Sequence, residues 1–323
     1  MKFFLKLANV LVALGGLLAG SAQASNDYPN KPVRLIIPFA AGGPADLVGR
    51  EIARALDKEL GQPIVVVNQG GGHGMPAINQ VLNAPADGYT LMMPASGNLT
   101  IPSKAMEGRD VLKELAPISQ VTQSPHVLVV SSKLPVKSVS ELIAYAKAHP
   151  GKVNFGSAGT GGLAHLGMEL FKSEAKVDVV HVPYKGTSQV VTDLASGEVQ
   201  ALFSSMPSLK PLMDKGSVRA IGMSAPSKGE ITSRIPLISA QGLPQFTYTT
   251  WYGLFAKEGT PQAIIDRLNS ALVKVLSNPE LNQKFEPQGI EFITGTPKAL
   301  ADMVRRDQQK WKQVIQEAGI TIE

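Results

Sequence analysis

Four glycine-containing turns follow apolar runs in this sequence, and each could bind an anion. They read "PFAAGG" from Pro38, "NQGGGHG" from Asn68, "PASGN" from Pro94 and "GSAGTGG" from Gly156. Where such a turn leads into a helix, the N–H groups of the first helical turn and the helix dipole favour a negative charge. A single glycine cluster can equally be a tight turn that needs positive φ. Several such turns in both halves of the chain favour an anion-binding cleft.

Polar side chains lie in or beside these turns. Ser96, Ser157 and Thr160 could add hydroxyl donors to the backbone groups. Asp46 stands at a predicted helix start, where a carboxylate is expected to cap N–H groups. His165 stands one helical turn after the last glycine cluster, where we expect a packing or hydrogen-bonding role more than that of a general base.

Catalytic patterns are missing from the sequence. It contains no P-loop, no G-x-S-x-G elbow and no H-E-x-x-H, and the first turn does not match the dinucleotide fingerprint. The five histidines are scattered, which disfavours a metal site. We therefore predict a protein that is not an enzyme and uses no cofactor or metal. A hydrolase with His165 as its base is the weakest alternative.

Strands and helices are predicted to alternate along most of the chain. Apolar runs typical of buried parallel strands are separated by stretches with helical periodicity. The predicted strands are Val33–Phe39, Ile64–Val67, Thr90–Met93, His126–Val130, Val153–Gly156, Val179–Val182, Ala201–Phe203, Ala220–Met223 and Trp251–Phe255. This alternation predicts an α/β fold with two mostly parallel sheets flanked by helices.

The middle of the chain carries its own strand–helix series between turn-rich flanks, "TQSP" and "SAPSKGE". The two C-terminal helices are expected to pack on the first domain. We therefore predict that residues 25–124 plus 226–323 form lobe one and that residues 125–225 form lobe two. A chain that leaves one lobe and returns to it crosses twice, which predicts a hinge.

The first 24 residues have the pattern of a signal peptide. Lys2 and Lys6 precede an apolar run, and Ala22-Gln23-Ala24 is a small-x-small cleavage signal. Export to the periplasm as a soluble protein is expected, and the absence of cysteine means that no disulfide supports the fold. The formal net charge is only +5, without a Lys/Arg run and with few aromatic residues, so nucleic acid is an unfavoured partner.

The motifs together resemble the extracytoplasmic solute receptors of tripartite tricarboxylate transporters, the Bug or TctC family. The matching stretches include "YPNKPVRLIIPFAAGGPADLVGR", "ADGYTLMM", "GKVNFGSAGTGGLAHLGMELF", "VHVPYKG" and "WYGLFAKEGTP", which span nearly the whole chain in order. The resemblance implies a two-lobed periplasmic binding protein of the second structural type. Such a receptor closes on a small carboxylate and delivers it to membrane permease subunits. A monomer is expected, and a sensor subunit that signals to a receptor kinase is the alternative.

Carried onto matching positions, the resemblance implies a set of ligand-binding residues. They are Phe39, Ala40, Gly43, Ala45 and Asp46 in lobe one, Ser157, Ala158, Thr160, His165 and Tyr184 in lobe two, and Ser96, Asn98 and Ser204 at strand ends. The family usually has a hydroxyl residue at the position of Ala45. It also usually has an arginine at the position of Gln69, and this departure argues mildly against a tricarboxylate ligand.

Overall fold

The computed structural model describes residues 28–102, 107–184 and 187–322. The predicted signal peptide, residues 1–24, lies outside the described residues. The chain divides into two compact units. The first unit comprises Met1–Met93, Asp110–Ile118 and Leu254–Val275, and the second comprises Pro94–Arg109, Ser119–Gly253 and Leu276–Glu323.

The first unit is built from a βαβ segment near the N-terminus and most of helix α10. Its elements are β1 (Val33–Ile37), α2 (Pro44–Leu60), β2 (Ile64–Asn68), η1 (Gly72–Gly74), α3 (Met75–Leu82), β3 (Thr90–Met92), α5 (Val111–Glu114) and most of α10 (Gln262–Leu276). Strand β1 is buried at four of its five residues and pairs in parallel with both β2 and β3. One face of α2 is buried, with Val48, Ile52 and Leu56 nearly inaccessible.

The second unit contains most of the remaining elements. They are α4 (Ser96–Thr100), β5 (Val127–Ser131), α6 (Val139–Ala148), β6 (Asn154–Ser157), α7 (Leu163–Ala175), β7 (Val180–Pro183), α8 (Thr187–Ser196), β8 (Ala201–Ser204), α9 (Met206–Asp214), β9 (Val218–Met223), η3 (Thr232–Arg234), η4 (Ile238–Gln241), α11 (Pro279–Phe285), η5 (Glu286–Gln288), β11 (Glu291–Phe292) and α12 (Pro297–Ala318). Strands β4 (Leu115–Pro125) and β10 (Thr249–Lys257) each run from one unit into the other along the chain.

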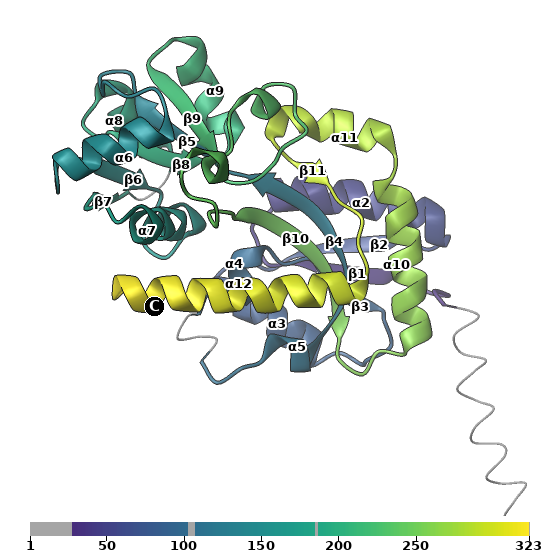
Figure 1. Ribbon diagram of the computed structural model, residues 1–323. Coiled ribbons are helices and arrows are strands. Elements are labelled where there is room, and N and C mark those ends of the chain that lie inside the picture. The colour runs from purple at the N-terminus through teal and green to yellow at the C-terminus, as the bar shows by residue number, and fades with distance from the viewer. Residues whose placement is uncertain (1–27, 103–106, 185–186, 323) are drawn as a thin grey trace, which may run out of the picture. The chain divides into compact units, whose positions relative to one another are not determined.

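The strands form two sheets, which confirms the predicted two-sheet α/β fold (Figure 1). Their orders are β11-β4-β10-β3-β1-β2 and β7-β6-β8-β5-β9. Both sheets are mixed, because β5 is antiparallel to β8 and β9, and β10 is antiparallel to β3. The parallel pairs lie around β1 and β6. The carboxyl ends of these two strands lead through glycine turns into α2 and α7.

The core of the second unit joins its sheet to the C-terminal helix. Trp311 of α12 is 1% exposed and belongs to the same buried cluster as Phe155 and Phe203 from the sheet. Helix α12 packs on α7 and α4, and Figure 1 shows it as the long yellow helix beside α7. The sequence had suggested that the C-terminal helices pack on the first domain. Most of α10 lies in the first unit, whereas α12, on which Leu300, Val304, Trp311 and Val314 are buried, packs on α4 and α7 of the second unit.

Candidate functional site

The first glycine turn joins β1 to α2 and presents backbone groups. Helix α2 begins after Gly43, and its first intrahelical bond runs from Leu47 N to Gly43 O at 3.0 Å. The N–H groups of Ala45 and Asp46 therefore stand in the first turn, where a helix supplies no acceptor for them. Phe39 is half-buried, and Ala40 is exposed. This turn has the geometry of a helix N-terminus that can bind an anion.

Asp46 folds back onto this turn. Its carboxylate accepts hydrogen bonds from Gly42 N (2.8 Å), Arg50 Nε (2.9 Å) and Asn68 Nδ2 (3.0 Å), and its side chain is only 4% exposed. The hydrogen bond from Arg50 is the largest cause that holds the pKa of Asp46 below its usual value, against the raising effect of burial. Asp46 thus holds the turn in shape through three donors of the protein itself.

A second loop supports the same turn from the end of β2. Asn68 Nδ2 also donates to Phe39 O at 3.2 Å, and Gln69 N donates to Ile37 O at 2.8 Å. Gly70 lies so close that a Cβ atom there would stand 3.1 Å from Ala40 N and 3.4 Å from the carbonyl carbon of Phe39. The glycine at position 70 is therefore required for the close approach of the two loops.

We expect Gly70→Ala to weaken ligand binding about tenfold while changing stability little. The added methyl group would press on the backbone at Ala40 and displace N–H groups that bind the ligand, and a displacement worth about 1.4 kcal/mol is tenfold in affinity. Calorimetric titration with a binding carboxylate would measure the effect. Gly295→Ala is a control for the loss of a glycine, because Gly295 has no positive φ and a Cβ atom there would meet only Ser119 Oγ, at 4.0 Å. Equal affinity of Gly70→Ala and wild type would contradict the role of this contact.

The second glycine turn joins β6 to α7 in the second unit. Ser157, which is fully buried, ends β6, and its carbonyl accepts from Tyr184 N at 2.9 Å. The first intrahelical bond of α7 runs from Leu166 N to Gly162 O at 3.0 Å, so the N–H groups of Leu163 and Ala164 lie in the first turn. The two turns thus repeat one arrangement, a buried strand, glycines and a long helix.

A pocket of about 340 Å³ opens on this second turn. It is lined by His126, Ala158, Gly159, Thr160, Gly162, Leu163 and Ala164. Two predicted residues, Ala158 and Thr160, therefore line one pocket. Sequence reasoning missed His126, which directly precedes β5.

The ring of His126 is placed by contacts from distant parts of the chain. Its Nε2 atom lies 3.0 Å from Thr250 Oγ1, and its ring centroid lies 5.0 Å from that of Tyr248. Its Nδ1 atom is buried and has no hydrogen-bond partner among the described residues. Burial lowers the pKa of His126 to about 4, so the ring is neutral at neutral pH.

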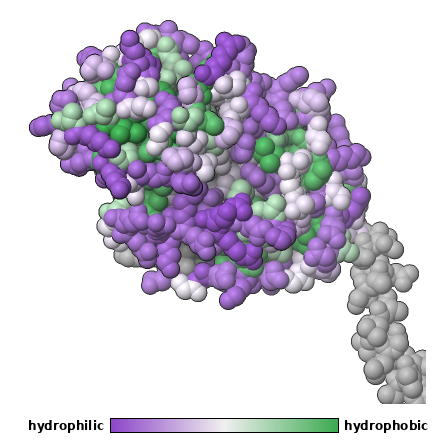
Figure 2. Space-filling model, viewed as in Figure 1, coloured by the Kyte–Doolittle hydropathy of each residue, from purple (hydrophilic) through white to green (hydrophobic). Residues whose placement is uncertain are grey.

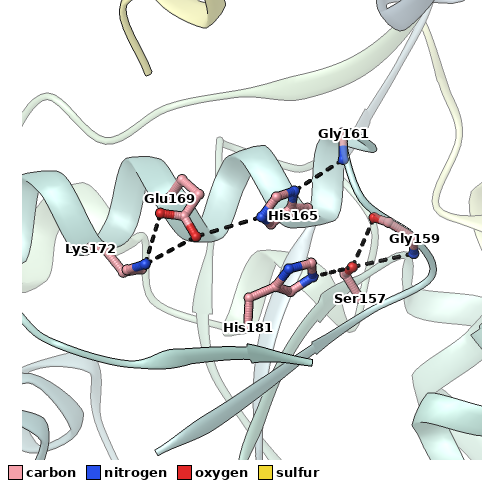
Figure 3. Close-up of polar contacts among 7 residues, drawn as sticks. All are labelled: Ser157, Gly159, Gly161, His165, Glu169, Lys172 and His181. Atoms are coloured by element: carbon pink, nitrogen blue, oxygen red, sulfur yellow. Dashed lines mark hydrogen bonds and ion pairs between the residues drawn. The ribbon is translucent and has the colours of Figure 1, made fainter. Parts of the chain in front are cut away.

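Two further histidines lie behind the second turn, and Figure 3 shows them stacked. The rings of His165 and His181 are 3.7 Å apart and inclined by 13°. His165 Nδ1 accepts from Gly161 N at 3.0 Å, and His181 Nε2 lies 2.7 Å from Ser157 Oγ. His165 was predicted as a site residue, whereas His181 was missed because its partners come from other elements.

The contact between Ser157 and His181 has the composition of a catalytic dyad but the wrong hydrogen bonds. The Ser157 hydroxyl donates to Gly159 O at 2.9 Å and lies 2.7 Å from His181 Nε2, and an imidazole N–H at this nitrogen satisfies both contacts. A base must instead accept the proton of the nucleophile. Since Ser157 is also fully buried, we assign this pair to fixing the turn.

The other predicted residues lie elsewhere in the second unit. Asn98 Oδ1 accepts from Ala95 N at 3.0 Å, and Ser96 Oγ from Trp251 N at 3.5 Å. The Tyr184 hydroxyl donates a hydrogen bond to Asp193 Oδ2 at 2.7 Å. Burial and this hydrogen bond raise the pKa of Tyr184 to about 12. Ser204 pairs with Val127, which follows His126, and so ends β8 beside that residue.

We expect the protein to lose stability as the pH falls from about 6.5 towards 4. Burial lowers the pKa of both His126 and His181 to about 4, with the neighbouring His165 a further cause for His181. Unfolded histidine titrates near 6.5. Within this window the unfolded chain binds protons that the folded chain does not, so the free energy of unfolding decreases as the pH falls.

Thermal unfolding followed by circular dichroism between pH 7.5 and 4 would measure this effect. Replacing both histidines by glutamine should flatten the dependence. A melting temperature that is equally pH-dependent in wild type and in this double variant would contradict the assignment.

Within the described ranges, no group of three His, Cys, Asp or Glu side chains could hold a metal ion. Likewise, none of the helices in the described part of the chain is long and apolar enough to cross a membrane. Figure 2 shows hydrophilic residues over most of the viewed face, with hydrophobic residues in small groups.

Two helix N-termini that offer backbone donors on an α/β scaffold suit the binding of an anionic solute. The chain matches the family model described as "Tripartite tricarboxylate transporter family receptor" over residues 48–320. It belongs to this family of receptors and is not an enzyme.

Relatives of known structure and sequence agree with this assignment. The chain is 32% identical over 325 residues to protein BugT of Bordetella pertussis, covering 99% of this chain and 98% of BugT. It is also similar to R. palustris Rpa4515, solved with adipate, with 32% identity, a TM-score of 0.73 and coverage of 92% and 100%. MatC from Rhodopseudomonas palustris, solved with bound malate, shares 29% identity with a TM-score of 0.69 and coverage of 89% and 100%.

Proposed function

We propose that this protein is a periplasmic receptor that captures a small organic acid and delivers it to the membrane permease of a tripartite tricarboxylate-type transporter. The family match supports the receptor role, and the carboxylates in the structures of two relatives support the ligand class. The sensing alternative, a subunit that signals to a kinase, has no support from these relatives.

The observation that carries the proposal is the repeated turn. Each unit presents a helix of more than ten residues that begins at a glycine, Gly43 for α2 and Gly162 for α7. Glycine has no side chain to cap the helix, so the first-turn N–H groups are left for another acceptor. A carboxylate oxygen satisfies such groups and interacts favourably with the helix dipole.

The side chains that line the pocket in the second unit limit the class of ligand that it can bind. None of the residues that line it carries a charged side chain, and His126 is neutral at neutral pH. Neutral donors can hold one carboxylate at this turn, but no cation there pairs with a second one. We therefore favour a mono- or dicarboxylate over a tricarboxylate.

The proposal keeps the lobes expected from the sequence, residues 25–124 plus 226–323 and residues 125–225. In this scheme the ligand is enclosed between the lobes when they close about the crossover segments, and closure excludes water. The predicted site residues in both lobes belong to the same proposal, with Asp46, Ser157 and His165 as residues that hold the turns and do not touch the ligand. The receptor would act as a monomer that docks on permease subunits.

A ligand panel tests the proposed function. Purified, ligand-free protein would be titrated calorimetrically with acetate, benzoate, malate, adipate and citrate. Adipamide and dimethyl adipate are matched controls, because they keep the length of adipate and remove its charge. We expect at least one mono- or dicarboxylate to bind and both neutral analogues to fail. If no carboxylate bound, or if the neutral analogues bound equally well, the proposal would be contradicted.

A further inference from the structure

The turn between β6 and α7 is held by side chains that lie behind it. Gly159 and Gly161 have φ values of +146° and +80°, which glycine adopts readily and which leave the turn without intrinsic rigidity. Ser157 Oγ accepts from Gly159 N at 3.3 Å and donates to Gly159 O, and His165 Nδ1 accepts from Gly161 N. Two of the six residues from Ser157 to Gly162 are therefore fixed by these bonds.

The hydrogen bonds define the tautomers of both histidines. Nδ1 of His165 accepts a hydrogen bond from Gly161 N, so the ring proton of the neutral imidazole lies on Nε2. That Nε2 atom lies 3.6 Å from Glu169 Oε1. The Ser157 hydroxyl, which has a single proton, lies 2.9 Å from Gly159 O and 2.7 Å from His181 Nε2. An Nε2–H tautomer of His181 satisfies both contacts at once, because the hydroxyl then donates to Gly159 O and accepts from the imidazole.

Charged groups behind the pair hold His165 in this orientation. Glu169 is 7% exposed and accepts from Lys172 at 2.9 Å, one helical turn beyond His165 on α7. Burial raises the pKa of Glu169, but the hydrogen bonds from His165 and Lys172 outweigh it and keep the pKa below the usual value. Glu317 of α12 lines the same surface hollow as Glu169 and Lys172. Figure 3 shows the chain from Lys172 through Glu169 and His165 to Gly161.

We propose that His165 and His181 are positioning residues: as a stacked pair, they hold the turn Ser157–Gly162 in the conformation that presents the N–H groups of α7. Neither ring lines the pocket, so each acts through the turn and not by touching ligand. The link to affinity rests on the proposed function, whereas the effect on the turn itself does not.

The first test is spectroscopic and needs no ligand. Long-range ¹H–¹⁵N correlation spectra of the ¹⁵N-labelled protein at pH 7 report which imidazole nitrogen carries the proton. Both His165 and His181 are expected to be Nε2–H tautomers. A proton on Nδ1 of His165 would overturn the proposal, because the bond from Gly161 could not then exist.

The second test compares paired variants. His165→Phe keeps a ring for stacking and removes the acceptor, whereas His165→Asn can restore an acceptor near the Nδ1 position. His181→Leu removes the donor to Ser157, and His181→Gln can restore it. Amide hydrogen exchange of residues 157–166 should become about tenfold faster in His165→Phe and in His181→Leu, as expected for the loss of one hydrogen bond. In His165→Asn and His181→Gln the exchange rates should return towards those of the wild type. His149→Phe is the control, because His149 is an exposed residue that stacks on Tyr145 at the end of α6.

Affinity for adipate separates this inference from the proposed function. If adipate binds the wild type, Phe and Leu variants should lose about tenfold in affinity with melting temperatures within a few degrees of wild type. If no carboxylate binds but exchange of the turn still responds to the variants, the positioning role stands and the receptor proposal fails. Unchanged exchange in His165→Phe and His181→Leu would overturn the positioning role, whatever binds.

Discussion

Replacing Asp46 by alanine is expected to reduce carboxylate affinity by more than about 100-fold and to lower the free energy of unfolding by about 2–3 kcal/mol. The carboxylate accepts from Gly42, Arg50 and Asn68, and all three of these hydrogen bonds would be lost. The loss at Gly42, which has a φ of +84°, frees the segment that leads into α2. The N–H groups of Ala45 and its neighbours would then no longer be fixed for the ligand.

Titration calorimetry and urea unfolding measure the two effects separately. Asp266→Ala is the matched control, since Asp266 is an exposed carboxylate in the first unit that contacts Gln262 on its own helix. The affinity and stability of Asp46→Asn should lie between those of the wild type and of Asp46→Ala, because an amide oxygen keeps one acceptor but not the charge. Full affinity in Asp46→Ala would show that this residue does not shape the binding turn.

The second large effect is expected at Trp311, where alanine should destabilise the protein by about 3–5 kcal/mol. Trp311 is 1% exposed and lies 5.7 Å, centroid to centroid, from Tyr248 in an edge-on arrangement. It also belongs to the buried cluster of the sheet in the second unit. Its removal would leave a cavity between α12 and that core, and closely packed interiors refill such cavities only in part.

Urea unfolding of the full chain measures this prediction, with Trp311→Phe as the conservative variant. Phenylalanine keeps an aromatic ring at the site, so its loss of stability should be less than half of that caused by alanine. If Trp311→Ala changed the free energy of unfolding by less than 1 kcal/mol, α12 would not be an integral part of the core of the second unit.

Most of the sheet could be predicted from the sequence because buried strands read as apolar runs. The run from Val33 and the run from Ile64 begin where β1 and β2 begin. Strand β4 was missed, because Pro117 and Pro125 and several polar residues disguise it although it lies inside a sheet. Strand β11 has only two residues and carries too little pattern to be recognised.

The direction of the strands depended on information that the local pattern does not hold. Alternating strands and helices favoured largely parallel sheets, but β5 is antiparallel to both of its neighbours. It follows β4 almost directly, with His126 between them, and no helix intervenes to return the chain. Because β4 belongs to the other sheet, no crossover helix within its own sheet precedes β5, and the local pattern does not set the direction of β5.

The candidate site was predictable where it is continuous in sequence. The turns at Phe39–Asp46 and Ser157–His165 are visible because glycines follow a strand and precede a helix. His126 and His181 were not, since their neighbours meet only in the fold. His126 contacts Thr250, 124 residues away. His181 of β7 lies opposite Phe155 of the neighbouring strand β6. Single histidines in strands carry no spacing signal, so only the assembled sheet reveals them.

The central proposal is that the helix N-termini of α2 and of α7 bind a carboxylate ligand. Its most direct test is a backbone amide NMR titration of the assigned protein with adipate, or with the tightest carboxylate from the panel. We predict that the amide resonances of Ala45 and Asp46 in α2 and of Leu163 and Ala164 in α7 shift together, with one shared affinity, and that adipamide shifts neither set. Shifts at one turn alone, or only at residues outside both turns, would contradict the account.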